Sequence, residues 1–376
     1  MKDEVKEMFV PPPYPYEQLN EFRVAAESLP GGAVDLSIGT PCDPVPEIVS
    51  KAFVSDSSIE SARPYPASVG SDDFLKAVSE WLNRSLQVEI PQTSIGACIG
   101  TKEIVTGIPS LLKLRTPAKD TVLYPAVSYP SYLMGAQLAS CRSVAVPVDD
   151  NWRIDLSGID EADIERALCL WVNSPGNPAG AIENLAMTAE WGRANEVTVI
   201  SDECYVEFTW DSDPKSILQE TKKGVIAVHS LSKRSNLAGM RVGFYAGDEE
   251  IVGYLREVRK HQGFMLPGPA QMAGIAALSD QTHVEIQKKL YFERLSKLIE
   301  IFRSLGIQAV MPKGSFYLWI ETPDVDEWGL VEMLAKNIGM VVTPGEFFGD
   351  QGKGHIRVAA VAADDRIELL AQRAGV

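Results

Sequence analysis

Short apolar runs alternate with amphipathic segments along most of the chain. Residues 71–86 place Phe74, Val78 and Leu82 at helical spacing, and a second helical or turn-rich segment lies at 185–195. Buried strands that alternate with helices are typical of a largely parallel sheet covered on both faces. The pattern therefore predicts an α/β fold. The apolar runs lie at 94–99, 121–123, 143–148, 169–172, 198–201, 225–228 and 242–246.

The two ends of the chain differ from this middle part. Prolines are frequent over residues 10–46, which indicates an extended arm and a loop around a short helix at 16–28. After a long helical pattern at 283–305, ended by Gly306, the C-terminal part is typical of a smaller α/β unit. We predict a large domain at 45–280 and a small domain that combines 1–44 with 281–376. The expected C-terminal elements are strands at 315–320 and 355–360, helices at 326–338 and at the end, and a turn at 344–345.

Composition narrows the class of protein. The 376 residues are 45% hydrophobic and 23% charged, which is typical of a soluble globular protein of two domains. Lys plus Arg is 35 and Asp plus Glu is 51, so the net charge of 35 − 51 = −16 argues against nucleic acid or an anionic membrane as partner. Five widely spaced cysteines without a CxxC pair indicate neither a disulfide framework nor a metal site. We expect a cytoplasmic protein.

A lysine follows the apolar run at 225–228. Two serines, Ser230 and Ser232, lie within the three residues before Lys233, and Arg241 follows eight residues after it. The hydroxyls and the guanidinium are good donors to a phosphate, and lysine forms Schiff bases with carbonyl cofactors once its pKa is lowered. Taken alone, a solvated loop with a basic residue explains this segment about equally well.

Polar residues also follow three other strands. Asp202 closes the run at 198–201 and is suited to pair with a protonated pyridine nitrogen, while Tyr205 could bond the ring's phenolic oxygen. Asn177, in a turn-rich loop, could donate to the same oxygen, and Gly100 before Thr101 presents backbone N–H groups to an anion. Each feature taken alone is explained at least as well by an ordinary turn or helix cap.

The order of these motifs resembles the fold-type I pyridoxal phosphate enzymes, specifically the class I and II aminotransferases. The resemblance covers nearly the whole chain. It includes Gly39 in a segment similar to the family's N-terminal substrate loop, Tyr65 in one similar to its tyrosine segment, and Arg357, similar to its carboxylate-binding arginine. The resemblance implies pyridoxal 5′-phosphate as cofactor and an amino acid and a 2-oxo acid as substrates.

The resemblance also implies a role for each matching residue. Lys233 would hold the cofactor as a Schiff base and carry the proton between Cα and C4′. Arg357 would bind the substrate α-carboxylate near the Gly39 backbone. Tyr65 would reach the phosphate of a neighbouring subunit, so a homodimer is expected. Further cofactor contacts are expected from Thr101, Lys102, Ser230, Ser232 and Arg241 at the phosphate and from Asp202, Asn177, Tyr205 and a stacking Tyr129 at the ring. The stacking aromatic commonly lies two residues after the proline, where this chain has Val127.

Within the family, the chain resembles most the actinobacterial type of N-succinyldiaminopimelate aminotransferase of lysine biosynthesis. The supporting stretches begin at Tyr14, Arg259 and Pro344. Glutamate and the succinylated substrate both carry a distal carboxylate, for which Lys260 and Arg23 are candidates, although a solvated surface charge is the better interpretation of each. Another aminotransferase, for aspartate, alanine or an aromatic amino acid, and a C–S lyase of the same fold are the alternatives. The acidic chain gives no support to a DNA-binding regulator, and Lys233 argues against a protein that binds ligand without catalysis.

Overall fold

The computed structural model describes residues 9–12, 15–322 and 326–376; Pro13 and Tyr14 of the predicted arm lie outside this range. Within it, seven strands form one sheet in the order β2-β8-β7-β6-β5-β3-β4. Strand β8 runs antiparallel to both of its neighbours and the other pairs are parallel, so the largely parallel sheet is confirmed. The strands are β2 (Ile95–Ile99), β3 (Thr121–Pro125), β4 (Arg142–Val146), β5 (Ala167–Asn173), β6 (Thr198–Asp202), β7 (Val225–Ser230) and β8 (Val242–Gly247).

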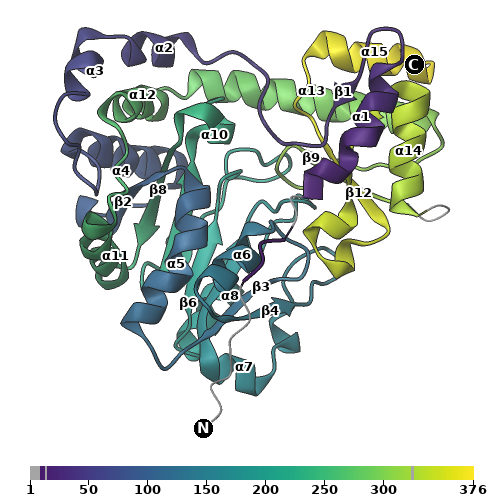
Figure 1. Cartoon of the computed structure of the whole chain (residues 1–376). Helices are drawn as coiled ribbons and strands as arrows, with labels where there is room; N and C mark the ends of the chain where they lie inside the picture. The colour runs from purple at the N-terminus through teal and green to yellow at the C-terminus, as the bar shows by residue number, and fades with distance from the viewer. Residues whose placement is uncertain (1–8, 13–14, 323–325) are drawn as a thin grey trace.

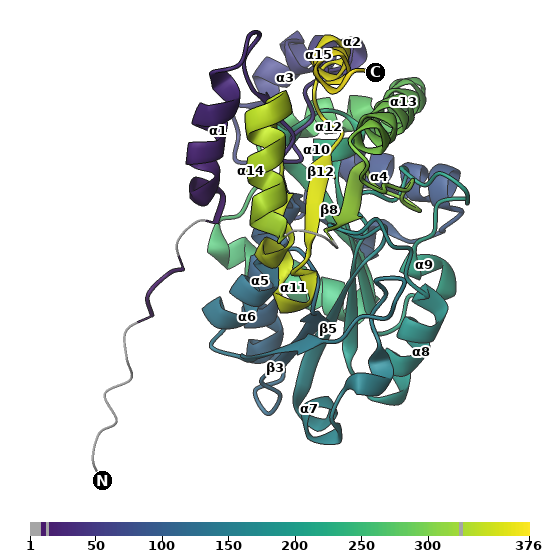
Figure 2. The same cartoon turned by 90° about the vertical axis from the view of Figure 1, so that its right-hand side faces the viewer.

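Helices cover both faces of this sheet (Figures 1 and 2). Helix α4 (Asp72–Leu86) begins after Ser71, whose side chain caps it by accepting from the Phe74 N–H, so the predicted helix at 71–86 is confirmed. Successive strand residues point to opposite faces, which places Leu170 in one buried cluster and Trp171 in another. The flanking helices are α2 (Glu47–Phe53), α3 (Asp56–Ser61), α5 (Thr101–Arg115), α6 (Ser131–Leu138), α7 (Glu161–Arg166), α8 (Leu185–Ala194), α9 (Ile217–Glu220), α10 (Leu231–Arg234), α11 (Glu249–Gln262) and α12 (Gly268–Ser279).

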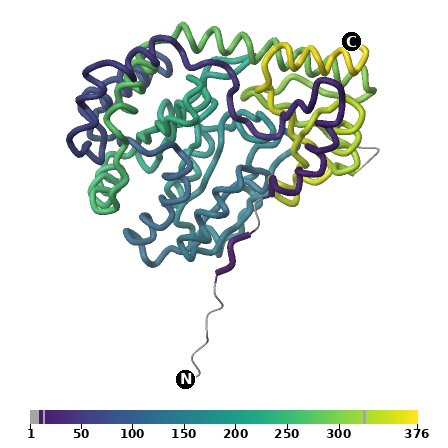
Figure 3. The backbone as a smooth tube through the Cα atoms, turned by 45° about the horizontal axis from the view of Figure 1, so that its top comes forward, coloured from purple at the N-terminus to yellow at the C-terminus, as the bar shows by residue number. Residues whose placement is uncertain are grey.

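The N-terminal and C-terminal segments lie side by side, as Figures 1 and 3 show by their purple and yellow colours. The pairing of β1 (Val34–Asp35) with β10 (Met340–Val341) is parallel and joins the two ends directly. A third buried cluster combines residues of 19–36 with residues of 284–371. Its elements include α1 (Asn20–Glu27), α13 (Thr282–Ser304), β9 (Tyr317–Glu321), α14 (Glu327–Ile338), β12 (His355–Ala359) and α15 (Asp364–Ala374), and β11 (Thr343–Pro344) pairs with β12.

The third cluster also includes Val127, Tyr205 and Phe208 from the part of the chain that builds the seven-stranded sheet. The two parts therefore share an apolar boundary, and the division into domains at residue 280 stays a prediction. Across the described ranges, no helix is long and apolar enough to cross a membrane.

Candidate active site

Polar side chains gather beyond the carboxyl ends of the parallel strands, where ligands of such sheets bind. Register places Asn173 of β5 beside Asp202 of β6, and Asp202 beside Val228 of β7. The Asn173 amide donates to the Asp202 carbonyl over 2.8 Å, which ties the two strand ends together. Lys233 follows on the short helix α10. Three of the predicted motifs thus meet at one edge of the sheet.

Lys233 is a half-buried side chain in a setting that favours its free amine. Burial lowers the pKa of its ammonium to about 8, and the cations Arg357 and Arg241 add to this effect. Its Nζ donates to the carbonyl oxygen of Gly39, so the N-terminal loop closes over the lysine. An amine with a pKa near 8 is a usable nucleophile and proton carrier at neutral pH.

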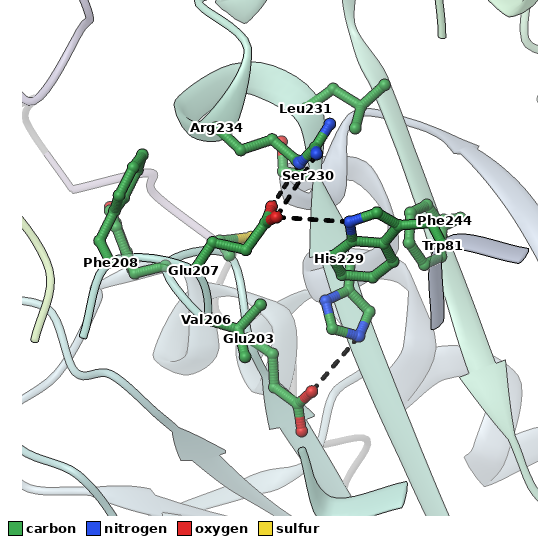
Figure 4. Close-up of a pocket in the computed structure, with 12 residues that line it drawn as sticks. Trp81, Glu203, Val206, Glu207, Phe208, His229, Ser230, Leu231, Arg234 and Phe244 are labelled. Atoms are coloured by element: carbon green, nitrogen blue, oxygen red, sulfur yellow. Dashed lines mark hydrogen bonds and ion pairs between the residues drawn. The ribbon is translucent and has the colours of Figure 1, made fainter. Parts of the chain in front are cut away.

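A buried ion pair fixes the helix that carries Lys233. The next residue, Arg234, pairs with Glu207 and also donates to the Ala277 carbonyl over 2.8 Å. Figure 4 shows this pair beside His229 and Glu203, whose facing atoms lie 3.3 Å apart. Burial raises the pKa of Glu203 to about 7 and lowers that of His229 to about 3, so both groups resist ionisation in this interior.

Asp202 is held by two donors. The Tyr132 hydroxyl donates to its Oδ2 over 2.9 Å, and the Cys204 N–H donates to its Oδ1 over 3.2 Å. Burial nevertheless raises the pKa of this carboxyl. Tyr132 is itself fully buried and stacks on Trp171, with ring centroids 5.0 Å apart. A cation placed against Asp202 would restore its ionised form, which is the environment that a pyridinium nitrogen requires.

Arg357 on β12 faces the same site from the C-terminal part of the chain. Its Nη1 donates to the Asn177 side-chain oxygen over 2.8 Å. Its Nη2 donates to the Ser37 carbonyl, and the guanidinium lies between the rings of Tyr317 and Phe348, 4.4 and 4.6 Å from their centroids. The Tyr317 hydroxyl bonds the Tyr205 hydroxyl over 2.9 Å. Asn177, Tyr205 and Arg357 are therefore brought together.

The predicted phosphate donors lie around the start of α5. Gly100 has φ +67°, and a Cβ there would lie 2.2 Å from Nη2 of Arg241, so glycine is needed for the close approach of this guanidinium. Thr101 opens the helix, and its hydroxyl lies 3.4 Å from the Cys204 sulfur beside Asp202. The Ser230 and Ser232 hydroxyls bond each other over 2.9 Å. Backbone N–H groups at a helix start, together with Arg241, form a suitable anion site.

Three further predicted residues differ in their contacts with this cluster. Tyr129 lies edge-on to Tyr132, whereas Val127 is buried in the third apolar cluster, so Tyr129 is the aromatic of this loop beside Asp202. Lys102 is exposed, with its Nζ 6.0 Å from the centre of the Tyr129 ring. Tyr65 is 94% exposed and has no contact with the cluster among the described residues.

The two candidates for a distal carboxylate are already paired. Arg23 forms an ion pair of 2.8 Å with Asp35 and donates to the Ser37 hydroxyl, so it supports the loop under Arg357. Lys260 pairs with Glu257 on the exposed side of α11. Tyr132 and Tyr317 belong to this cluster although no sequence pattern indicated them. Their signals are weak, since Tyr132 is one aromatic in the first turn of α6 and Tyr317 is one aromatic on β9, the strand beside that of Arg357.

A comparison with models of protein families identifies the family of this chain. The model of aminotransferase class I and II matches residues 32–373 of this chain. The chain belongs to the class I and II aminotransferases. It is therefore a pyridoxal phosphate-dependent transaminase with the fold of the fold-type I enzymes.

Two curated relatives and one solved structure illustrate the range of this aminotransferase family. The 4-dedimethylamino-4-oxo-anhydrotetracycline transaminase OxyQ of Streptomyces rimosus is 35% identical over 96% of this chain and 98% of its own length. The LL-diaminopimelate aminotransferase of Aquifex aeolicus is 33% identical over 96% of each chain. The structure of a probable N-succinyldiaminopimelate aminotransferase from Thermus thermophilus has a TM-score of 0.85 and 28% identity, covering 96% of this chain and all of the other.

The site of this aminotransferase fits its cofactor. The ring nitrogen would face the buried Asp202 carboxylate, whose pKa is raised. The aldehyde would face Lys233, whose pKa is lowered to about 8. The phosphate would face the helix start to which Gly100 admits Arg241. When bound, pyridoxal phosphate supplies the electron sink that lets the substrate Cα lose its proton. With the cofactor bound, Lys233 Nζ would take and return that proton, and Asp202 would hold a proton on the ring nitrogen.

Proposed function

We propose that this aminotransferase moves an amino group between glutamate and N-succinyl-2-amino-6-oxopimelate, in the diaminopimelate route to lysine. The proposal includes the residue roles given above: Lys233 as the covalent and proton-carrying group, and Arg357 as the α-carboxylate site. The matching positions along the chain, the likeness to the Thermus structure and the chemistry of the site all support it.

The observation that carries the carboxylate-binding part of the proposal is a buried guanidinium with no counter-ion among the described residues. Arg357 is 2% exposed, and its acceptors among the described residues are the neutral oxygens of Asn177, Ser37 and Tyr16. A buried charge is costly unless an opposite charge pairs with it. An anionic ligand would satisfy Arg357, and a carboxylate matches the guanidinium with two parallel hydrogen bonds.

A second candidate substrate is LL-diaminopimelate without the succinyl group. The relative from Aquifex aeolicus, which carries that name, aligns over 96% of this chain. Both candidates present the same α-amino acid end to Arg357 and differ at the distant nitrogen. We place the succinylated substrate first because the stretches that begin at Tyr14, Arg259 and Pro344 resemble the N-succinyldiaminopimelate enzymes.

A panel of amino donors tests the proposal. Purified holoenzyme receives 2-oxoglutarate and, one at a time, N-succinyl-LL-diaminopimelate, LL-diaminopimelate, aspartate, alanine and phenylalanine, and glutamate formation is followed. We expect the highest kcat/KM with the succinylated donor. A higher value for free LL-diaminopimelate would replace the first candidate by the second. Preference for aspartate, alanine or phenylalanine would overturn both.

A variant pair tests the role of Arg357 in the same assay. Arg357→Lys loses the bidentate geometry and should lower kcat/KM for every amino donor by a factor of about 30 or more, since such contacts are worth about 2–5 kcal/mol. Arg166→Lys is the matched control, because Arg166 is half exposed and pairs with Asp120 far from β12. Unchanged kcat/KM in Arg357→Lys would contradict the assigned role.

A further inference from the structure

Some N–H groups of the Arg357 guanidinium have hydrogen-bond acceptors and others have none among the described residues. A guanidinium has five N–H donors. Three of them have acceptors among the described residues: the Asn177 side-chain oxygen at Nη1, and the Ser37 carbonyl and the Tyr16 hydroxyl at Nη2. The Nε–H is buried and has no acceptor in the part of the chain that the structure describes. Besides Nε, one hydrogen of Nη1 is therefore free, and both hydrogens of Nη2 are occupied.

This distribution conflicts with binding of a carboxylate. Two parallel N–H groups can be offered by Nη1 with Nη2, or by Nε with Nη2, because the Nε–H and the second Nη1 hydrogen point along different edges of the planar group. Both edges include Nη2. A carboxylate can thus be bound by two parallel hydrogen bonds only if one of the present acceptors leaves Nη2.

The two acceptors at Nη2 are not equally able to leave. Ser37 is fully buried, its N–H donates to Asp35 over 2.9 Å, and its carbonyl also accepts from Thr343 over 2.7 Å, so this oxygen is fixed. The Tyr16 hydroxyl is on a half-buried side chain and its contact with Nη2 is longer, at 3.3 Å. The Tyr16 backbone carbonyl is held by Arg23 over 2.9 Å, so the ring can turn while the chain stays in place.

We propose that the Tyr16 hydroxyl is a placeholder that occupies the carboxylate position on Arg357 until an anionic substrate displaces it. The inference rests on the proposed role of Arg357 as the carboxylate site. The phenol supplies a neutral oxygen to a buried cation while the site is empty of substrate. A carboxylate competes successfully because it carries a full charge, whereas an amide or ester at the same position does not. Tyr16 thus makes binding selective for anionic ligands.

Removal of the hydroxyl should strengthen binding. In Tyr16→Phe the ring keeps its edge contact with Phe347, whose centroid lies 5.6 Å away, but the competing oxygen is gone. The dissociation constant of 2-oxoglutarate is measured by titration calorimetry on the pyridoxal form of the holoenzyme, which has no amino group to transfer to it. We expect the dissociation constant to fall about three- to tenfold, as for loss of one weak bond to a charged group. Unchanged or weaker binding would overturn the placeholder.

Two further variants separate this inference from the proposed function. Tyr254→Phe removes a hydroxyl that donates to the Leu111 carbonyl away from the site, and it should leave the dissociation constant unchanged. Arg357→Lys should weaken binding, and adding Tyr16→Phe to it should then give no gain. Weaker binding in Arg357→Lys without any gain in Tyr16→Phe rejects the placeholder alone. Unchanged binding in Arg357→Lys rejects the role of Arg357 and the placeholder with it.

Discussion

At the scale of single residues, the pKa of Lys233 sets a pH dependence for cofactor attachment. The folded apoenzyme holds this pKa at about 8, mainly by burial. Below pH 8 the side chain is an ammonium that cannot attack an aldehyde, and above it the free amine predominates. On mixing apoenzyme with pyridoxal phosphate, the rate of covalent attachment should rise about tenfold per pH unit up to pH 8 and then level off.

Cofactor absorbance in a stopped-flow instrument measures this rate, and Lys233→Ala is the control that should show no attachment at any pH. A rate that keeps rising to pH 10 would mean that the site leaves the lysine at its ordinary pKa.

The role of Lys233 was predictable because its neighbours Ser230 and Arg241 are close in sequence. Tyr132 was not, because its bond to Asp202 joins residues 70 positions apart and leaves no local pattern.

At the scale of elements, the four-residue helix α10 depends on a buried ion pair for its position. Glu207 accepts from Arg234 and, over 3.0 Å, from Gln281 on the loop before α13. Removal of one partner leaves the other charge buried and unpaired. Glu207→Ala should therefore lower the free energy of unfolding by about 3–5 kcal/mol, as measured by urea denaturation. Glu332→Ala removes the exposed pair with Lys336 and should cost at most about 1 kcal/mol.

A loss of unfolding free energy in Glu207→Ala as small as in Glu332→Ala would show that the pair does not stabilise this region.

Elements with a long apolar pattern could be predicted from the sequence: the helix expected at 283–305 is α13, Thr282–Ser304. The antiparallel direction of β8 could not be predicted, because a strand buried on both faces has the same apolar pattern in either direction. The two-residue strands β1 and β10 are too short to leave any period.

At the scale of the whole molecule, the site is built from both ends of the chain. Gly39 and Ser37 come from the N-terminal loop, Arg357 from β12, and Lys233 from between them. The order of motifs along the sequence predicted Gly39, Lys233 and Arg357 but not Ser37, and no pattern gives the distances that join them. Tyr65 is the exception, since it is 94% exposed in the single chain. An aromatic residue this exposed is consistent with our proposal that it completes the site of a partner subunit.

Mixed dimers test this proposal. One subunit carries Tyr65→Ala and keeps Lys233, the other carries Lys233→Ala and keeps Tyr65, and different tags allow the mixed dimer to be purified. If Tyr65 serves the partner's site, the first subunit's Lys233 meets an intact Tyr65, and one site of two is wild type. The mixed dimer should then show about half the wild-type kcat with the wild-type KM, whereas each parent dimer is impaired. If Tyr65 serves its own subunit, no site holds both residues, so kcat or KM would stay at the Tyr65→Ala values. A purified chain that stays monomeric at micromolar concentration while fully active would contradict the shared site altogether.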